Sequence, residues 1–287
     1  MIGKIIELLI NGLALGALYA IASAGFSLIF GVMRVLNIAH GIFLVLSAYL
    51  TYFIYRCLDM GFIEGVIIAI LSVTALGLLT EKLVLYPLRA FKESLLILTL
   101  CIGMIIEQVI YLTIGPVYIM NPVLISGTID MYNIKISTNR IILLFLSIFI
   151  TLCLWAFLKY TKMGKAIRAI VQDEEVAAMY GVPVKRVRMI TMGLSCALVS
   201  VAGILLNSIY MFDPSIGWEF MGVAIAVAIF GGLGNVFGTV AAGLILGIIE
   251  SFVGYFISTN LRLVSYFISI FLILLIRPRG IFGGGKT

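Results

Sequence analysis

Apolar runs of membrane-spanning length are the feature that most constrains the fold of this chain. Stretches of roughly 20 residues with few charges recur along the sequence, and a helix needs about that length to cross a bilayer core of about 30 Å. Apolar residues make up 63% of the chain and charged residues 11%, with a mean hydropathy of +1.23. Water-soluble domains have far more charge. The sequence therefore predicts an all-α, polytopic membrane helical bundle.

About eight to nine spans are expected, and the last third of the chain is the least regular. Clear apolar runs cover residues 8–30, 42–55, 64–85, 95–114, 141–158 and 190–211. After them, Gly231, Gly232 and Gly234 interrupt a long uncharged stretch, which predicts a short element followed by helices over 236–256 and 263–276. Such glycines allow close helix packing, and a helix broken by them can also present backbone groups to a solute.

The distribution of basic residues predicts the orientation in the membrane. Residues 159–188, residues 82–92 and the C-terminal tail hold 7, 3 and 3 of the 19 lysines and arginines. Because cytoplasmic loops are enriched in these residues, we expect all three segments in the cytoplasm. The loop over 115–138, with room for a small hairpin, and the N-terminus are then expected outside. The net charge of +6 follows this topology, and no nucleic-acid partner is expected.

The segment 161–189 is the only one in which charge is dense. Asp173 can cap a short helix, and two glutamates follow it in the first turn, where the helix dipole favours negative charge. Gly181 suits the position just after the helix, and Pro183 stops further winding. A compact, capped helix on a cytoplasmic loop indicates an element that docks onto another protein.

Catalytic and metal-binding patterns are lacking in the sequence. The single histidine and four scattered cysteines cannot supply a multi-histidine or paired-cysteine metal site within one chain. Residues 280–287 match the phosphate-binding loop pattern, but that loop needs a strand before it and a helix after it, and a membrane helix precedes this match. We expect a protein that is not an enzyme and has no catalytic residue, cofactor or metal site.

Polar residues inside the apolar runs have two interpretations each. Asn37 and His40 lie in a polar break between spans, which must be buried in protein or face water. Glu107 and Glu250 either bond between helices or face a cavity, because ionisable groups at membrane depth are costly. Glu81, near a span end, is interpreted as an interfacial group. The candidate residues of a translocation path are Asn37, His40, Glu107, Gly231, Gly232, Gly234 and Glu250.

An ordered set of motifs carries a resemblance to a known family. The motifs are Asn11-Gly12 with Gly16 and Tyr19, Asn37-Ile38-Ala39-His40-Gly41, Gly164-Lys165-Ala166-Ile167-Arg168-Ala169, Glu175-Val176-Ala177-Ala178-Met179-Tyr180-Gly181, Gly231-Gly232-Leu233-Gly234 with Gly238, and Arg277-Pro278-Arg279-Gly280. With them, nearly the whole chain resembles the permease subunits of bacterial ABC importers for branched-chain amino acids, the LivH/LivM family. Ile42 departs from the acidic residue that many LivH-type members have there, whereas the short length favours a LivH-like subunit.

The resemblance implies a single transmembrane permease domain over residues 1–287, with 161–189 as its cytoplasmic coupling loop. It implies the pore-forming half of an ATP-driven importer in the bacterial cytoplasmic (inner) membrane, carrying Leu, Ile or Val inward. The implied partners are ABC ATPase subunits, a second permease subunit in a heterodimer, an extracytoplasmic solute-binding protein and membrane lipid. The implied ATPase-coupling residues are Gly164, Arg168, Asp173, Glu175, Ala177, Ala178 and Gly181.

Two other readings stay open. A urea, amide or sugar permease of the same superfamily would have a similar architecture. A secondary transporter that works without ATP is a different class, in which Glu107 and Glu250 would be proton-coupling groups.

Overall fold

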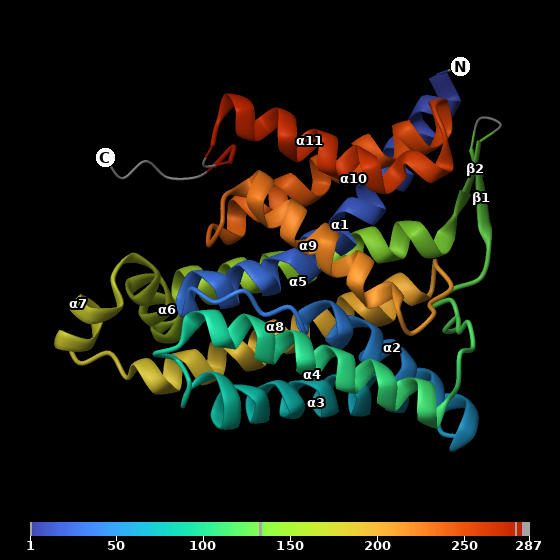
Figure 1. The fold of residues 1–287 in the computed structure, drawn as a ribbon. Helices are drawn as coiled ribbons and strands as arrows, with labels where there is room; N and C mark the ends of the chain where they lie inside the picture. Colours follow the sequence, from blue (N-terminus) through green and yellow to red (C-terminus); the bar gives the residue numbers. More distant parts are fainter. Residues whose placement is uncertain (1, 132–133, 279, 283–287) are drawn as a thin grey trace.

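The structure, a computed structural model, describes residues 2–131, 134–278 and 280–282. Over these residues the chain is a bundle of helices with one small β-hairpin (Figure 1). A π-turn over Glu81–Leu85 extends α3, and a 3₁₀ turn over Thr259–Leu261 precedes α11. The helices are α1 (Ile2–Met33), α2 (His40–Cys57), α3 (Phe62–Thr80), α4 (Lys92–Thr113), α5 (Thr138–Tyr160), α6 (Lys162–Gln172), α7 (Glu174–Met179), α8 (Val184–Asn207), α9 (Ile216–Gly231), α10 (Val236–Phe256) and α11 (Arg262–Ile276).

Among the described residues, six helices are long and apolar enough to cross a membrane: α1, α3 with its π-turn, α4, α5, α8 and α10. The apolar helices α9 and α11 have 16 and 15 residues. At 1.5 Å per residue each covers only about 22–24 Å, less than a bilayer core of about 30 Å. The expected all-α membrane bundle is confirmed, and the expected eight to nine spans are supported roughly.

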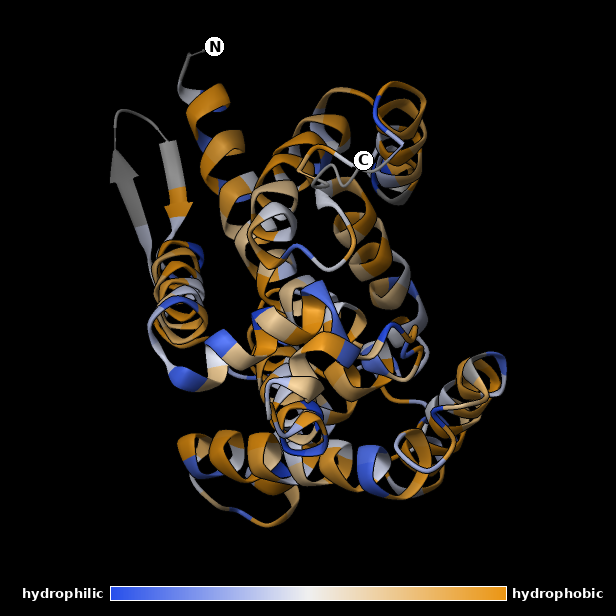
Figure 2. Ribbon diagram, turned by 90° about the vertical axis from the view of Figure 1, so that its left-hand side faces the viewer, coloured by the Kyte–Doolittle hydropathy of each residue, from blue (hydrophilic) through white to orange (hydrophobic). Residues whose placement is uncertain are grey.

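Helices α1 and α8 form the centre of the bundle. In their most apolar windows 61% and 72% of residues are buried, against 22% in α3, α4 and α5. Figure 2 shows apolar residues around most turns of the long helices rather than along one stripe, as expected of helices that face lipid as well as protein. The large side chains of Ile63 and Leu112, for example, are 74% and 78% exposed.

The two ends of the bundle carry different features. Figure 1 shows α6, α7, the start of α4 and the end of α11 at one end, and the N-terminus with the hairpin at the other. The hairpin pairs β1 (Thr128–Met131) with β2 (Ile134–Ser137) in antiparallel register, which confirms a hairpin within 115–138. Residues 82–92, residues 159–188 and the end of α11 thus share one end, as the predicted orientation requires.

The charged segment contains more helix than the sequence indicated. Thr161 caps a helix that was not foreseen, α6, by accepting a hydrogen bond of 2.9 Å from the backbone N–H of Gly164. The span expected to start near residue 190 begins at Val184, directly after Pro183. Lys185, Arg186 and Arg188 therefore belong to the first turns of α8, because proline permits a helix to start just after it.

Candidate coupling helix and transport site

The N-terminus of α7 is capped by the residue that the sequence indicated. The Asp173 carboxylate accepts hydrogen bonds of 3.0 Å from the backbone N–H groups of both Glu175 and Val176. These bonds satisfy two of the N–H groups that a helix start leaves without partners, and the negative charge faces the positive end of the helix dipole. The start of α7 is therefore fixed by Asp173.

The C-terminus of α7 is closed by two backbone hydrogen bonds around a glycine. The N–H of Val182 donates to the Ala177 carbonyl at 3.1 Å, and the N–H of Gly181 donates to the Ala178 carbonyl at 2.9 Å. Gly181 has a φ of +79°, a left-handed conformation that residues with a Cβ adopt at a cost. This is the Schellman arrangement, so both ends of this six-residue helix are held.

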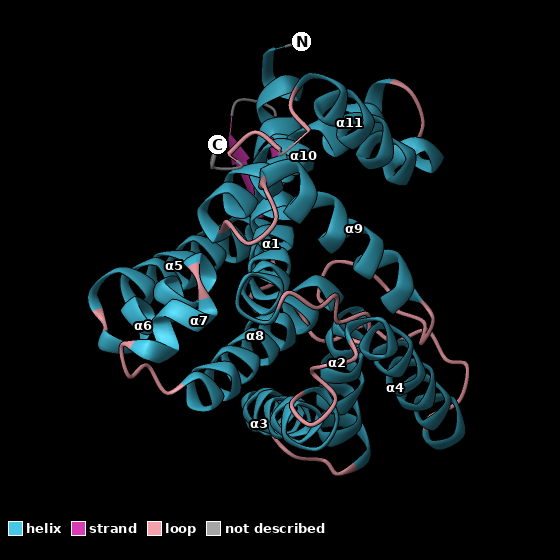
Figure 3. Ribbon diagram, turned by 60° about the vertical axis from the view of Figure 1, so that its left-hand side comes forward, coloured by secondary structure: helices cyan, strands magenta, loops and turns pink. Residues whose placement is uncertain are grey.

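Helix α7 buries one side chain against the protein and exposes most of the others. Ala177 is buried, whereas Met179 and Tyr180 are 84% and 86% exposed and Val176 is 46% exposed. Glu175 and Ala178 are exposed as well. Figure 3 shows α6 and α7 beside each other next to the end of α5. We call the exposed side chains of Val176, Met179 and Tyr180 the α7 tip.

Gly164 and Arg168 fasten α6 to the end of α5. A Cβ on Gly164 would lie 2.4 Å from the carbonyl oxygens of Phe157 and Leu158, so only glycine permits this approach. The Arg168 guanidinium donates a hydrogen bond to the Leu158 carbonyl, one of the groups that the end of α5 leaves without a helical partner. Both residues therefore position the segment that carries α7.

The glycine break lies at the α7 end of the bundle, as a turn between α9 and α10. Gly232 and Gly234 have φ values of +102° and +81°, and a Cβ on Gly231 would lie 2.4 Å from the backbone of Gly238. Gly234 in turn packs against Gly31 at the end of α1, where a Cβ on Gly234 would lie 3.3 Å from the Gly31 Cα. This turn packs two helices closely, and a role in translocation stays a prediction.

Asn37 and His40, the two polar candidates at the break between α1 and α2, are fully buried. The His40 Nε2 lies 3.0 Å from the Ala22 carbonyl oxygen, and its Nδ1 has no partner among the described residues. The Asn37 side chain has no hydrogen bond to described residues either. A Cβ on Gly41 would lie 2.2 Å from the Gly217 carbonyl oxygen, so the break is pressed against the start of α9. The structure thus places Asn37 and His40 together inside the protein.

The two intramembrane glutamates both bond to a neighbouring helix. Glu107 on α4 accepts a hydrogen bond of 2.8 Å from the Trp218 indole of α9. Glu250 on α10 is 5% exposed and accepts a hydrogen bond from the Tyr266 hydroxyl of α11. Glu107 is half-buried, whereas Glu250 also lines a cavity. The candidate path residues therefore occupy several separate places.

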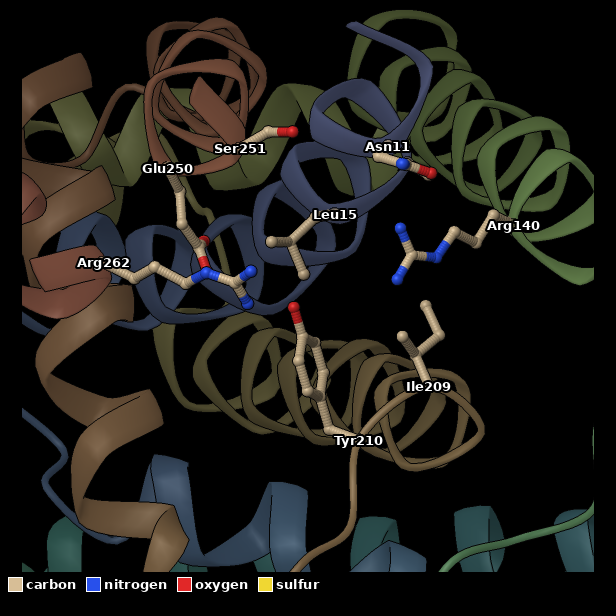
Figure 4. Close-up of a pocket in the computed structure, with 9 residues that line it drawn as sticks. Asn11, Leu15, Arg140, Ile209, Tyr210, Glu250, Ser251 and Arg262 are labelled. Atoms are coloured by element: carbon tan, nitrogen blue, oxygen red, sulfur yellow. The ribbon is translucent and has the colours of Figure 1, made fainter. Parts of the chain in front are cut away.

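The cavity beside Glu250 lies between α1, α5, α10, α11 and the segment that follows α8, and its volume is about 50 Å³. Figure 4 shows Glu250 and Arg262 reaching into it from one side, Arg140 pointing in from the other, and the Tyr210 hydroxyl between them. Burial raises the pKa of the Tyr210 phenol to about 12, and the nearby Glu250 charge adds to the rise. Tyr210 therefore stays a neutral hydrogen-bond donor at neutral pH.

Comparison with known proteins places these features in a family. The family model described as "Branched-chain amino acid transport system / permease component" matches residues 8–276. The high-affinity branched-chain amino acid transport system permease proteins LivH of Salmonella typhimurium and Escherichia coli K12 are 31% and 30% identical to this chain. Each alignment covers 97% of this chain and 95% of the relative. The chain belongs to this permease family.

A solved structure shares the fold of the permease. A chain of PsaBC from Streptococcus pneumoniae, determined in complex with Fab, aligns with a TM-score of 0.54 over 97% of both chains, at 14% sequence identity. The resemblance to LivH-type permeases is thus confirmed, and with it the inner-membrane location and the role of a transport subunit rather than an enzyme.

One expectation about the permease was wrong. Glu81 was interpreted as an interfacial group, yet it is fully buried in the π-turn, and its carboxylate lies 3.0 Å from the Nε of Arg188, which is 3% exposed. A carboxylate and a guanidinium removed from water this far need each other as partners. The pair fastens α8, the helix that follows α7, to the end of α3.

Sequence reasoning also missed the arginines of the cavity in the permease. Arg140 and Arg262 stand at the starts of α5 and α11, next to connections that the predicted topology places outside. Lys and Arg are scarce in short loops on that side. The departure of Arg140 and Arg262 from this trend was a signal in the sequence that could have marked them as functional candidates.

Proposed function

We propose that this permease forms half of a translocation pore, with a second permease subunit, and passes Leu, Ile or Val inward. In this proposal separate ATPase subunits drive it through α7, and an extracytoplasmic solute-binding protein delivers the solute. The observation that carries the coupling role is the α7 tip: a helix of six residues, closed at both ends, presents Met179 and Tyr180 almost fully exposed. Side chains of this size in water indicate a surface that a partner covers.

Three connections link α7 to the bundle and support transmission of a movement. Gly164 and Arg168 hold α6 against α5, and Arg188 ties the first turns of α8 to Glu81. Just before α7, the Arg34 guanidinium donates to the Val171 carbonyl at 3.4 Å, which joins the end of α6 to the end of α1. A displacement of α7 by closing ATPase subunits would therefore reach α1, α3, α5 and α8 together.

The substrate in this proposal follows from the relatives. Besides the LivH proteins, the permease protein BraD of Pseudomonas aeruginosa, 26% identical over 97% of this chain, is named for high-affinity branched-chain amino acid transport. A shared substrate class across several relatives favours Leu, Ile and Val over urea, amides or sugars. The relatives are described as permease proteins of a transport system, which favours a subunit that works with further proteins over a carrier that works alone.

Uptake by the assembled transporter in proteoliposomes tests the proposal. We expect Met179→Asp with Tyr180→Ala to leave the assembled complex intact but to lower leucine-stimulated ATPase activity and leucine uptake together, by about 10-fold or more. The matched control is Leu233→Asp, which changes an exposed apolar residue in the α9–α10 turn at the same end of the bundle. It should keep both activities.

Three outcomes contradict the proposal. Normal coupling in the α7 tip variant would remove the docking role. Uptake of urea or a sugar, with no uptake of Leu, Ile or Val, would show that the proposed substrate class is wrong. Leucine uptake by the permease alone, driven by a proton gradient without ATP, would place the protein among secondary transporters.

A further inference from the structure

The cavity beside Glu250 contains charged groups that no salt bridge between described residues joins. Among the described residues, the salt bridges join Lys4 to Glu7 and Arg188 to Glu81, so neither Arg140 nor Arg262 forms one. The Arg262 Nε is buried without a hydrogen-bond partner in that part of the chain. Glu250, 5% exposed, accepts a hydrogen bond from the Tyr266 hydroxyl, and the Arg262 guanidinium lies beside it. The cavity thus brings one carboxyl group and two guanidinium groups together.

A carboxyl group buried between membrane helices, beside two arginines that form no salt bridge with described residues, needs a physical reason. Ionisable groups within membrane helices are costly and usually face a cavity, a partner or a substrate. A ligand that carries both a positive and a negative group would pair with both signs at once. The smallest common ligand of this kind is an α-amino acid: its ammonium group suits the Glu250 carboxylate, and its carboxylate suits the planar guanidinium groups of Arg140 and Arg262.

A second compartment adjoins the charged cavity and is partly apolar. It encloses about 370 Å³ and shares Tyr210, Glu250 and Arg262 with the charged cavity. Its apolar wall includes Ile216, Phe220 and Val223 of α9. The charged cavity of about 50 Å³ has room for a polar head group only, so the rest of a ligand would extend into this larger compartment.

We propose that the charged cavity binds the zwitterionic head of the transported amino acid, and that the α9 wall receives its branched side chain. This inference rests on the proposed function and assigns contacts to it. The Glu250 carboxylate accepts from the substrate ammonium group, while Arg140 and Arg262 donate to the substrate carboxylate. Tyr210, as a neutral O–H donor between them, orients the head group.

Gly254 is a positioning residue for this site. A Cβ on Gly254 would lie 2.3 Å from the Nε of Arg262, so the absence of a side chain gives the guanidinium its place over α10. Gly254→Ala displaces Arg262 without removing its charge. This substitution therefore tests whether the position of the Arg262 guanidinium matters, while its charge is kept.

Binding of radiolabelled leucine to the purified permease–ATPase complex, without a solute-binding protein, tests the site. We expect the wild-type complex to bind leucine, and leucinamide or 4-methylpentanoate to compete about 10-fold more weakly or worse, because each lacks one charge of the head. Glu250→Gln, Arg262→Gln and Gly254→Ala should each weaken leucine binding by about 10-fold or more. The matched controls Glu64→Gln and Arg56→Gln neutralise exposed charges near the ends of α3 and α2 and should bind leucine normally.

Wild-type affinity in Glu250→Gln and Arg262→Gln, or no leucine binding by the wild-type complex, would overturn the inference. If either charge variant does not assemble, Ile216→Phe provides the test at a half-buried position: it narrows the apolar compartment and should weaken leucine binding more than alanine binding. Leucine uptake by the wild-type transporter with its binding protein is measured in parallel. Normal leucine uptake together with unchanged leucine binding in the cavity variants refutes this site alone. No uptake of Leu, Ile or Val refutes the proposed function.

Discussion

At the scale of single residues, the permease relies on a few polar side chains whose partners are fixed by geometry. Asp173 satisfies two backbone N–H groups at the start of α7, and Arg188 neutralises Glu81 inside the protein. Loss of the cap and loss of the counter-ion should destabilise the protein by different amounts. A cap can be replaced by another hydrogen-bond acceptor, whereas a buried charge depends on its one counter-ion.

The first prediction concerns the cap of α7. Asp173→Ala removes the acceptor and should destabilise α7 locally by about 0.5–2 kcal/mol. Faster amide hydrogen exchange in residues 174–179, measured on the assembled complex, reports this loss. Asp173→Asn keeps the cap and should behave like the wild type, so a fast-exchanging asparagine variant would contradict the capping role.

The second prediction concerns the buried ion pair. Arg188→Met leaves Glu81 without its counter-ion and should lower the free energy of unfolding by about 3–5 kcal/mol. The double variant Glu81→Leu with Arg188→Met removes both charges and should recover most of that loss. Thermal unfolding in detergent measures both, and a double variant less stable than Arg188→Met would contradict the pairing.

At the scale of elements, glycines decide how closely the helices pack. A Cβ on Gly247 of α10 would lie 2.3 Å from the Cα of Gly16 on α1, so the two backbones touch with no side chain between them. Small residues at such crossings permit the van der Waals contact that holds membrane helices together. The α1–α10 pair is therefore a rigid unit within the bundle.

The third prediction tests this contact. Gly247→Ala forces α10 away from α1 and should destabilise the protein by about 1–3 kcal/mol or more. The matched control is Gly222→Ala on α9, where a Cβ meets only the Phe267 ring at 3.8 Å, an ordinary contact. Equal thermal stability of the two variants would show that α1 and α10 can separate freely.

At the scale of the whole molecule, the bundle has two chemically different ends. Residues 82–92, α6, α7 and the end of α11 share one end, and the hairpin and the start of α1 share the other. The charged cavity is reached by residues at the starts of α5 and α11, which belong to the hairpin end. An importer that takes up solute at one end and docks ATPase subunits at the other requires this polarity.

The fourth prediction tests the orientation. In a cysteine-free background, Ser126→Cys near the hairpin should react with a membrane-impermeant maleimide added to intact cells. Tyr180→Cys, which replaces a side chain that is 86% exposed at the opposite end, should react only after the cells are opened. The reverse labelling pattern would invert the predicted topology.

The sequence by itself determined the features that depend on neighbouring residues. The positions of the spans follow from the apolar runs, and the ends of α7 follow from Asp173 and Gly181, because capping is satisfied within a few residues. The family is likewise evident from motifs. The amphipathic helix α6 was missed because it lies within a dense run of charges, where no apolar run marks it.

Only the tertiary structure decided which distant residues meet. Glu81 and Arg188 are 107 residues apart, and neither sequence neighbourhood reveals the pairing. The cavity likewise needs Arg140, Glu250 and Arg262 from three helices, whose rotation and approach depend on packing over the whole bundle. Local chemistry fixes where a helix begins and ends, whereas the direction in which its charges point depends on every helix packed around it.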